Sequence, residues 1–389
     1  MSEVRIPVVR KGKPIVKPKY VPLLMKDVLK REGTTGFNVA STFSGAGGSC
    51  TGYRLAGFNV RWANEFEPTA LKTYKMNCQE GCVADGRDIR TVKGSSVFEA
   101  TGIKHGELDL FDGSPPCQSF SSTGLREKGW GKTFAHGDGT NQRSDDLFEE
   151  YIRLIKELQP KTFVAENVTG LIKGAAKGYF KMVLAWMKEA GYDTQAAVID
   201  SRWLGVPQAR QRVIFVGIRN DIAQKVIAKV GRINRYPTPN DWYYSVADAC
   251  PWIGRKDGKT RLDCKHPICE DPIEHAEMEL GVSGKIAWGE CPIGSNHPIN
   301  FNCTRVDERF PCPTINAAHG CTTMHGIAHP YEPRRFTILE VKRICSFPDD
   351  FKMTGTFAER WTRLGNAVPP LMMHAIASAI RDNVLVHAA

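Results

Sequence analysis

The chain has 389 residues, of which 42% are hydrophobic and 24% charged. This composition excludes a disordered polypeptide and is typical of a globular protein with two or three domains. The 52 Lys and Arg outnumber the 42 Asp and Glu, and the net charge of +10 favours a polyanionic partner such as nucleic acid without proving one.

No run of about 18 apolar residues occurs, and the N-terminus MSEVRIPVVRKGK lacks the apolar stretch of a signal peptide. We therefore expect a cytoplasmic protein with no membrane segment. Twelve cysteines are dispersed along the chain, which favours reduced thiols over a disulfide framework. Because no CxxC pair occurs, we expect no metal, although a zinc site is the alternative for the seven that cluster in one region, Cys250, Cys264, Cys269, Cys291, Cys303, Cys312 and Cys321.

Residues 1–36 hold nine basic and three acidic residues, more than half of the net charge. This basic N-terminal extension is either a flexible arm that binds DNA phosphates or a solvated tail. Short apolar runs then predict buried strands at 37–43, 58–64, 108–113, 162–167, 196–200 and 213–219.

Helical periodicity separates these runs, for instance from Ser144 to the stop at Pro160, and from Tyr179 to Ala190. Strands that alternate with helices predict an α/β fold with a mostly parallel, doubly wound sheet, whose ligands bind beyond the carboxyl ends of the strands. From about residue 220 the chain becomes rich in Pro, Gly, Cys, His and Trp, which predicts a second, irregular domain. Helical patterns return at 334–351 and, after a turn, at 363–384.

The first predicted strand runs into the glycine loop FSGAGG, residues 43–48. Glycines between a strand and a helix let a cofactor approach the backbone, but Cys50 at the sixth position of GxGxxG argues against a nicotinamide. Twenty positions after Gly45, Glu65 is placed to accept hydrogen bonds from a ribose. Phe66 could lie against a purine, and Asp88 could reach an adenine amino group, although each acid alone is more often solvated.

In FDGSPPCQSF, Cys117 follows two prolines at the carboxyl end of a predicted strand. The rigid lead and the polar residues after it favour a nucleophilic thiol over a buried, inert cysteine. Glu166 and Asn167 end another strand, where a partly desolvated carboxyl could donate a hydrogen bond to a heterocycle. Arg210 and Arg212 begin a strand and project to one face, where they either hold a carbonyl oxygen or form a surface ion pair.

Together FSGAGG, NEFE, RDIR, SPPCQSF, AENV, QARQR, FTILEVKRICSFPDDF and LGNAVPP resemble the cytosine-carbon-5 DNA methyltransferases in order and spacing. The resemblance runs from about Val39 to the C-terminus, apart from the middle of the irregular domain. It implies a Rossmann-like methyltransferase sheet that binds S-adenosylmethionine (AdoMet) and a smaller target-recognition domain. We accordingly expect a catalytic domain at 37–219 plus 360–389 and a target-recognition domain at 220–359.

The resemblance implies that Cys117 attacks carbon 6 of a flipped cytosine, that Glu166 contacts ring nitrogen 3 and the exocyclic amine, and that Arg212, with Arg210 as a weaker assignment, contacts the base carbonyl. It implies a mobile loop at 124–139 that closes over the base. The AdoMet residues that it implies are Phe43, Ser44, Gly45, Ala46, Gly47, Gly48, Glu65, Phe66, Asp88, Ile89, Pro116, Asn366 and Ala367. The implied DNA contacts are Gln118, Ser121, Thr123, Thr314 and Ile315.

The resemblance further implies double-stranded DNA as partner, and we expect a monomer, with a cognate restriction endonuclease as a candidate partner. The nearest alternative is a relative that methylates tRNA, but the Cys-Phe-Thr tripeptide typical of those enzymes is absent. A DNA-binding protein without activity is a second alternative, against which the joint presence of Cys117, Glu166 and Arg212 argues. An oxidoreductase is a third alternative, against which the absence of a complete GxGxxG pattern argues.

Overall fold

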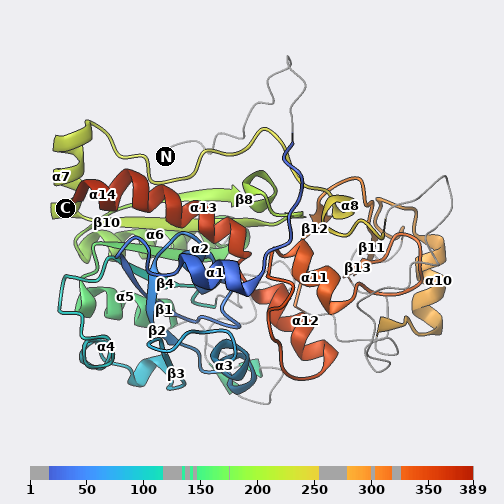
Figure 1. Cartoon of the computed structure of the whole chain (residues 1–389), viewed down its shortest axis with the longest axis horizontal. Helices are drawn as coiled ribbons and strands as arrows, with labels where there is room; N and C mark the ends of the chain where they lie inside the picture. The colour runs from blue at the N-terminus through green and yellow to red at the C-terminus, as the bar shows by residue number, and fades with distance from the viewer. Residues whose placement is uncertain are drawn as a thin grey trace.

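The computed structural model describes residues 17–116, 134–135, 141–142, 147–174, 176–253, 278–298, 303–317 and 326–388. A seven-stranded sheet in the order β3-β2-β1-β4-β7-β10-β8 forms its centre (Figure 1). Pairing is parallel from β3 to β7, whereas β10 is antiparallel to both of its neighbours. The strands are β1 Asn38–Thr42, β2 Asn59–Asn64, β3 Val83–Asp85, β4 Leu110–Gly113, β7 Thr162–Val168, β8 Tyr192–Asp200 and β10 Gln211–Arg219.

Helices cover both faces of this sheet, which confirms the predicted α/β, mostly parallel, doubly wound fold. One face packs Trp62, Phe111 and Phe163 against three helices, and the other packs Val39, Leu110 and Ile214 against three more. Because both faces are covered, β4 and most of β7 are continuously buried rather than alternating. The helices of the first face are α4 Gly94–Thr101, α5 Leu147–Leu158 and α6 Ala176–Glu189; those of the second are α2 Gly48–Leu55, α3 Pro68–Lys75 and α13 Pro370–Ile380.

Helix α7 (Asn220–Val230) and the terminal α14 (Val386–Ala388) pack against each other beside β10, the last strand but one of the sheet. Two further short strands, β5 (Phe134–Ala135) and β6 (Asn141–Gln142), pair with each other. No helix of the described ranges is long and apolar enough to cross a membrane.

A second lobe is built from short elements, which run from yellow to red-orange in Figure 1. Its core surrounds Phe336 and Trp361, and capping boxes begin three of its helices, at Ser245 with Asp248, at Thr337 with Glu340 and at Thr356 with Glu359. Strand β12 of this lobe pairs with β9 of the first, so the two lobes share backbone hydrogen bonds. The elements of the second lobe are α8 Val246–Ala249, α10 Val282–Glu290, β11 Cys303–Arg305, β12 Cys312–Pro313, β13 Gly326–Ala328, α11 Ile338–Ile344 and α12 Phe357–Asn366, and β9 of the first lobe spans Gln208–Ala209.

The described part of the basic extension, 17–36, is folded against both lobes. Lys17 pairs with Asp248 at 2.5 Å and the Tyr20 hydroxyl donates to the carbonyl of Arg343, both in the second lobe. The chain then forms α1 (Met25–Arg31), which packs on α2. This segment, blue in Figure 1, therefore connects the lobes.

The cysteine-rich region is only partly described, since Cys264, Cys269 and Cys321 lie outside the described residues. Cys250, Cys291, Cys303 and Cys312 are buried. Within the described ranges, no group of three or more His, Cys, Asp or Glu side chains could hold a metal ion.

Candidate active site

The glycine loop after β1 makes a tight turn of left-handed residues, with φ of 53° at Phe43, 54° at Gly45 and 100° at Gly47. A Cβ at Gly45 would meet nothing within 4 Å, so this glycine faces open space. A Cβ at Gly48 would lie 2.4 Å from the carbonyl oxygen of Val368. The loop is thus closed on one side by the turn between α12 and α13, which contains Val368 and is called the returning turn below, and it is open on the other side.

Glu65 supports this loop from the end of β2. Its carboxylate accepts the backbone N–H of Gly45 at 2.7 Å and that of Glu67 at 2.8 Å. Burial raises the pKa of Glu65, and these two N–H groups oppose that effect. Phe66 beside it is 41% exposed. A carboxylate with free acceptor positions and an open aromatic ring fit a ribose and a purine next to the open face of Gly45.

The other predicted cofactor residues differ in how open they are. Asp88 caps the turn Ile89–Thr91 by accepting the N–H of Arg90, with whose guanidinium it also pairs at 3.2 Å. Asn366 ends α12, and Ala367 follows it at the returning turn. The side chains of three predicted residues are instead buried in the protein, namely Ser44, Ala46 and Ile89.

Glu166 and Arg212 lie at the same edge of the sheet. Because β10 runs antiparallel to β7, its first residues meet the carboxyl end of β7, with Arg212 opposite Val168. The Nε of Arg212 lies 2.8 Å from Oε1 of Glu166, and both side chains are largely buried. The two residues that the sequence singled out separately therefore form one ion pair, largely removed from solvent.

Arg210 occupies a different place, at the junction of the lobes. Its guanidinium donates to the carbonyl of Ile315 at 3.2 Å and to that of Asn366 at 3.3 Å. Burial and the nearby charge of Arg212 lower the pKa of Arg210 to about 9. Thr314 donates to the carbonyl of Ala209 at 2.8 Å. Arg210 thus joins the segment with Thr314 and Ile315 to the C-terminal turn, and the side chain of Ile315 is buried.

Two contacts at this edge were not foreseen from the sequence. The Asn167 amide donates to the carbonyl of Pro115 at 3.1 Å and so fixes the backbone two residues before Cys117. Asp112, also buried, accepts the hydroxyl hydrogens of Ser41 at 2.8 Å and Tyr53 at 2.9 Å. The neighbouring motifs gave no signal for either contact, because both depend on which strands lie side by side.

Pro116 is partly buried and is the last described residue before the predicted nucleophile. Cys117, Gln118, Ser121 and Thr123 lie outside the described residues, as does most of the predicted closing loop at 124–139.

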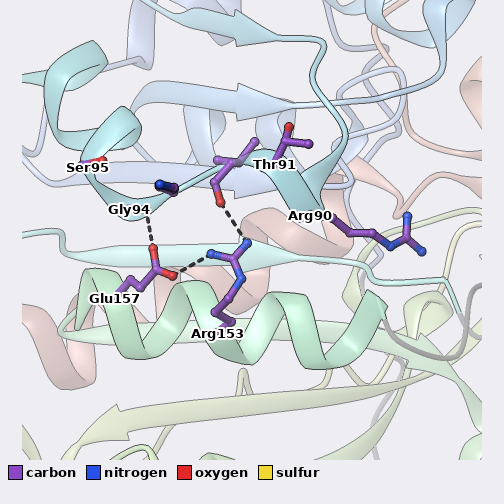
Figure 2. A pocket seen from close by; sticks show the side chains of 8 residues that line it. Arg90, Thr91, Gly94, Ser95, Arg153 and Glu157 are labelled. Atoms are coloured by element: carbon purple, nitrogen blue, oxygen red, sulfur yellow. Dashed lines mark hydrogen bonds and ion pairs between the residues drawn. The ribbon is translucent and has the colours of Figure 1, made fainter.

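A surface pocket of about 590 Å³ lies between η1 (Ile89–Thr91), the start of α4, and α5 (Figure 2). Arg153 there pairs with Glu157 at 2.7 Å and donates to the carbonyl of Val92, and Glu157 accepts the N–H of Gly94. The charges of these two side chains therefore compensate each other. The pocket contains none of the predicted site residues; its lining is Arg90, Thr91, Val92, Lys93, Gly94, Ser95, Arg153 and Glu157.

The sheet order, the single antiparallel strand β10 and the glycine loop after β1 define a Rossmann-like methyltransferase fold. Solved structures share it. A DNA modification methyltransferase encoded within an E. coli prophage has a TM-score of 0.67 at 22% identity, covering 90% of this chain and 99% of that one. DNMT2 of Spodoptera frugiperda has a TM-score of 0.60 at 16% identity, covering 89% and 100%.

Residues 37–382 match the family model of C-5 cytosine-specific DNA methylases, and the chain belongs to this family. Type II methyltransferase M1.HphI of Haemophilus parahaemolyticus is 30% identical over 343 residues, which cover 87% of this chain and 85% of that protein. Type II methyltransferase M.NgoPII of Neisseria gonorrhoeae is 29% identical, with 89% and 96% covered. The protein is a DNA cytosine-5 methyltransferase, and the resemblance drawn from its motifs is confirmed.

Proposed function

We propose that the protein methylates cytosine at carbon 5 within a specific duplex DNA sequence, through a covalent bond between Cys117 and a cytosine flipped out of the helix. The observation that carries the proposal is the Glu166–Arg212 ion pair at 2.8 Å, which lies at the sheet edge where β4 leads toward Cys117. It offers a carboxyl and a guanidinium side by side, the two groups needed to grip the polar edge of a cytosine.

AdoMet is the methyl donor that the family implies, and the described residues fit it. Gly45 leaves open space over the loop, Glu65 offers acceptors for the ribose, and Phe66 offers a ring for the adenine. Bound there, AdoMet would supply an electrophilic methyl group for carbon 5. The remaining proposed contacts are those predicted from the sequence, including Asp88, Pro116, Asn366 and Ala367.

The chain's own residues would act on the base as follows. The Cys117 thiolate forms a bond to carbon 6, which moves electron density to carbon 5. Glu166 holds ring nitrogen 3 and the exocyclic amine, and Arg212 holds the carbonyl oxygen. After methylation the carbon 5 proton leaves, the double bond re-forms and Cys117 departs as thiolate. Flipping the base costs a few kcal/mol of lost stacking and pairing.

We assign sequence recognition to residues 220–359, which include most of the second lobe, and catalysis to residues 37–219 and 360–389. The hydrogen bond from Arg210 to the carbonyl of Ile315 supports a role of the recognition segment near the site, because it holds Thr314 and Ile315 close to the start of β10. The Type II names of the relatives support a role in restriction and modification, with an endonuclease as partner. We propose that the protein is a monomer that acts in the cytoplasm in association with DNA.

Labelled AdoMet tests the proposal against methylation of tRNA. Purified protein is expected to transfer label to duplex DNA of mixed sequence, at cytosines that share one sequence context when mapped. Cys117→Ser is expected to abolish this transfer while duplex binding persists. Label on tRNA with none on DNA would reject the proposal.

A further inference from the structure

Asp112 is a buried carboxyl that the proposed reaction does not use. It lies in β4, five positions before Cys117, and is 1% exposed. Ser41 and Tyr53 donate their hydroxyl hydrogens to its two oxygens. Within the described chain, no Lys or Arg pairs with it, so its charge is not compensated by a cation. A buried carboxyl kept without a cation is costly and is therefore unusual as a purely structural element.

The register of the sheet places Asp112 in a polar row across four strands. Ser41 of β1 lies opposite Asp112 of β4, and Asp112 lies opposite Val164 of β7. Because side chains alternate along a strand, Glu166 lies on the same face as Asp112, one diagonal step toward the site. Glu166 in turn pairs with Arg212 of β10. Ser41, Asp112, Glu166 and Arg212 thus follow one another across the sheet.

The row also reaches the glycine loop. Ser44 donates its hydroxyl hydrogen to the Ser41 oxygen at 3.0 Å, and its backbone N–H donates to the carbonyl of Asn64. The hydroxyl of Thr42 donates to the backbone carbonyl of Asp112. Asp112 therefore connects the loop that is proposed to hold AdoMet with the strand that leads to Cys117.

We propose that Asp112 is a positioning residue for methyl transfer, which holds the Ser41 and Ser44 side of the glycine loop and acts through its charge on Glu166. This inference rests on the proposed function of the site. It assigns a role to a side chain that makes no contact with the base itself.

The titratable groups that face Asp112 determine how its charge acts. Cys50 and Tyr53 of α2, Tyr151 of α5 and Glu166 of β7 surround it. Burial raises the pKa of Cys50 and of both tyrosines, so these three stay neutral near pH 7.

Burial, with the charge of Glu166, raises the pKa of Asp112 to about 7, against the hydrogen bonds from Ser41 and Tyr53. Asp112 is therefore mostly neutral at pH 6 and mostly ionised at pH 8.5, where a second negative charge lies near Glu166. The ionised carboxylate also accepts the hydrogen bonds of Ser41 and Tyr53 more strongly than the neutral acid does, and so holds the glycine loop more firmly.

Asp112→Asn mimics the neutral carboxyl at every pH. Single-turnover methylation of a cognate duplex is therefore expected to match the wild-type rate within about twofold at pH 6, and to be at least about tenfold slower at pH 8.5, where wild-type Asp112 is ionised. In calorimetry without DNA, AdoMet is expected to bind the variant at least about threefold more weakly at pH 8.5, because the hydrogen bonds to the loop rearrange.

Asp109→Asn is the matched control. Asp109 directly precedes β4, is 4% exposed, and binds Lys161 and the N–H of Asn38 at the opposite end of the strand. The ratio of the Asp109→Asn methylation rate to the wild-type rate is expected to be the same at pH 6 and at pH 8.5. A constant ratio for Asp112→Asn, or unchanged AdoMet affinity, would overturn the proposal. A wild-type protein that leaves cytosine unmethylated would reject the proposed function instead.

Ser41→Ala tests the same row if Asp112→Asn does not fold. It removes a hydrogen bond that lowers the pKa of Asp112, so the pH-dependent rise in rate is expected to move to higher pH. An unmoved profile contradicts the coupling.

Discussion

At the scale of single residues, the site is organised around carboxyl groups whose surroundings differ. Glu166 lies beside a guanidinium, Glu65 beside two backbone N–H groups, and Asp112 beside two hydroxyls. Glu166 has a cation beside it, whereas Glu65 and Asp112 receive hydrogen bonds from neutral groups, and burial raises the pKa of both. The stability of the fold should respond to this difference.

The pKa of Asp112 predicts a pH-dependent stability. The pKa of an unfolded aspartate is about 3.9, and folding raises that of Asp112 to about 7, so the native state binds the extra proton between these values. The stability associated with Asp112 is complete below about pH 4 and is lost as the pH rises to about 7. The difference in free energy of unfolding between Asp112→Asn and wild type is therefore expected to shift in favour of the variant by on the order of 4 kcal/mol as the pH rises across this window.

Urea unfolding at several pH values measures this gain as a difference between the two proteins. Asp109→Asn, unfolded in parallel, accounts for the loss of an ordinary aspartate from the same sheet. A free energy difference between Asp112→Asn and wild type that stays constant from pH 4 to pH 7 would contradict the assigned protonation.

The sequence located these residues unevenly. Glu65, Glu166 and Arg212 could be predicted because each lies where a strand begins or ends, and strand ends are recognisable as limits of apolar runs. Asp112 and Asn167 could not be assigned partners, since Ser41 and Pro115 become neighbours only once strand order and register are known. The burial of the Ile89 side chain in the core could likewise not be read from the sequence, and its predicted contact with the cofactor stays a prediction.

At the scale of elements, the closure of the glycine loop by the returning turn before α13 is the most constrained contact. A Cβ at Gly48 would meet a backbone carbonyl, which cannot move aside as a side chain can. At Gly45 a Cβ meets open space, and only the left-handed φ of 54° opposes it. Glycine is thus favoured at position 48 by the close approach of a backbone carbonyl, and at position 45 by the left-handed backbone conformation.

Substitutions at these glycines should separate stability from cofactor binding. Gly48→Ala is expected to lower the free energy of unfolding by about 1–3 kcal/mol through the clash with Val368. Gly45→Ala is expected to cost about 1 kcal/mol of backbone strain, yet to weaken AdoMet binding more strongly, because its methyl group enters the proposed site. Chemical unfolding and calorimetry measure the two effects, and AdoMet affinity that is unchanged in Gly45→Ala, or an unchanged free energy of unfolding in Gly48→Ala, would be inconsistent with this geometry.

Elements with a strong pattern were also those predicted from the sequence. Six of the seven strands of the sheet were recognised as apolar runs, whereas β3, three residues at an edge with an exposed Val83, carries too short a pattern. The turn expected at LGNAVPP begins inside α12, because the capping box at Thr356 starts a helix that continues to Asn366. In the second lobe the elements are short and packing decides them, so composition alone indicated an irregular region.

At the scale of the whole molecule, the N-terminal segment connects the two lobes. Met25 and Val28 of α1 are buried in the core that contains Phe336 and Trp361 of the second lobe, and Glu32 pairs with the buried Arg54 of α2 at 3.0 Å. The extension was predicted as an arm or a tail, but its described part, 17–36, contributes to the core. The basic composition alone could not reveal this, because the apolar residues between the charges form only one short helix.

Truncation should therefore reveal two functions in one extension. Deletion of residues 1–31 is expected to lower the melting temperature by several degrees, since it exposes the surfaces that Met25 and Val28 cover. Deletion of residues 1–16 alone is the control for the longer deletion, and a fall in the salt dependence of DNA binding in this variant would assign their basic residues to phosphates. An unchanged melting temperature after the longer deletion would contradict the packing of α1.

Covalent catalysis at Cys117 is tested most directly with a duplex that carries 5-fluorocytosine at the mapped target, incubated with the protein and AdoMet. Carbon 5 then has no proton to lose, so the bond between Cys117 and carbon 6 is expected to persist as a complex stable to denaturation, with the nucleotide on the Cys117 peptide by mass spectrometry. The complex should be absent in Cys117→Ser and without AdoMet. Methylation of ordinary cytosine without any trapped complex, or a complex that survives in Cys117→Ser, would contradict the proposed mechanism.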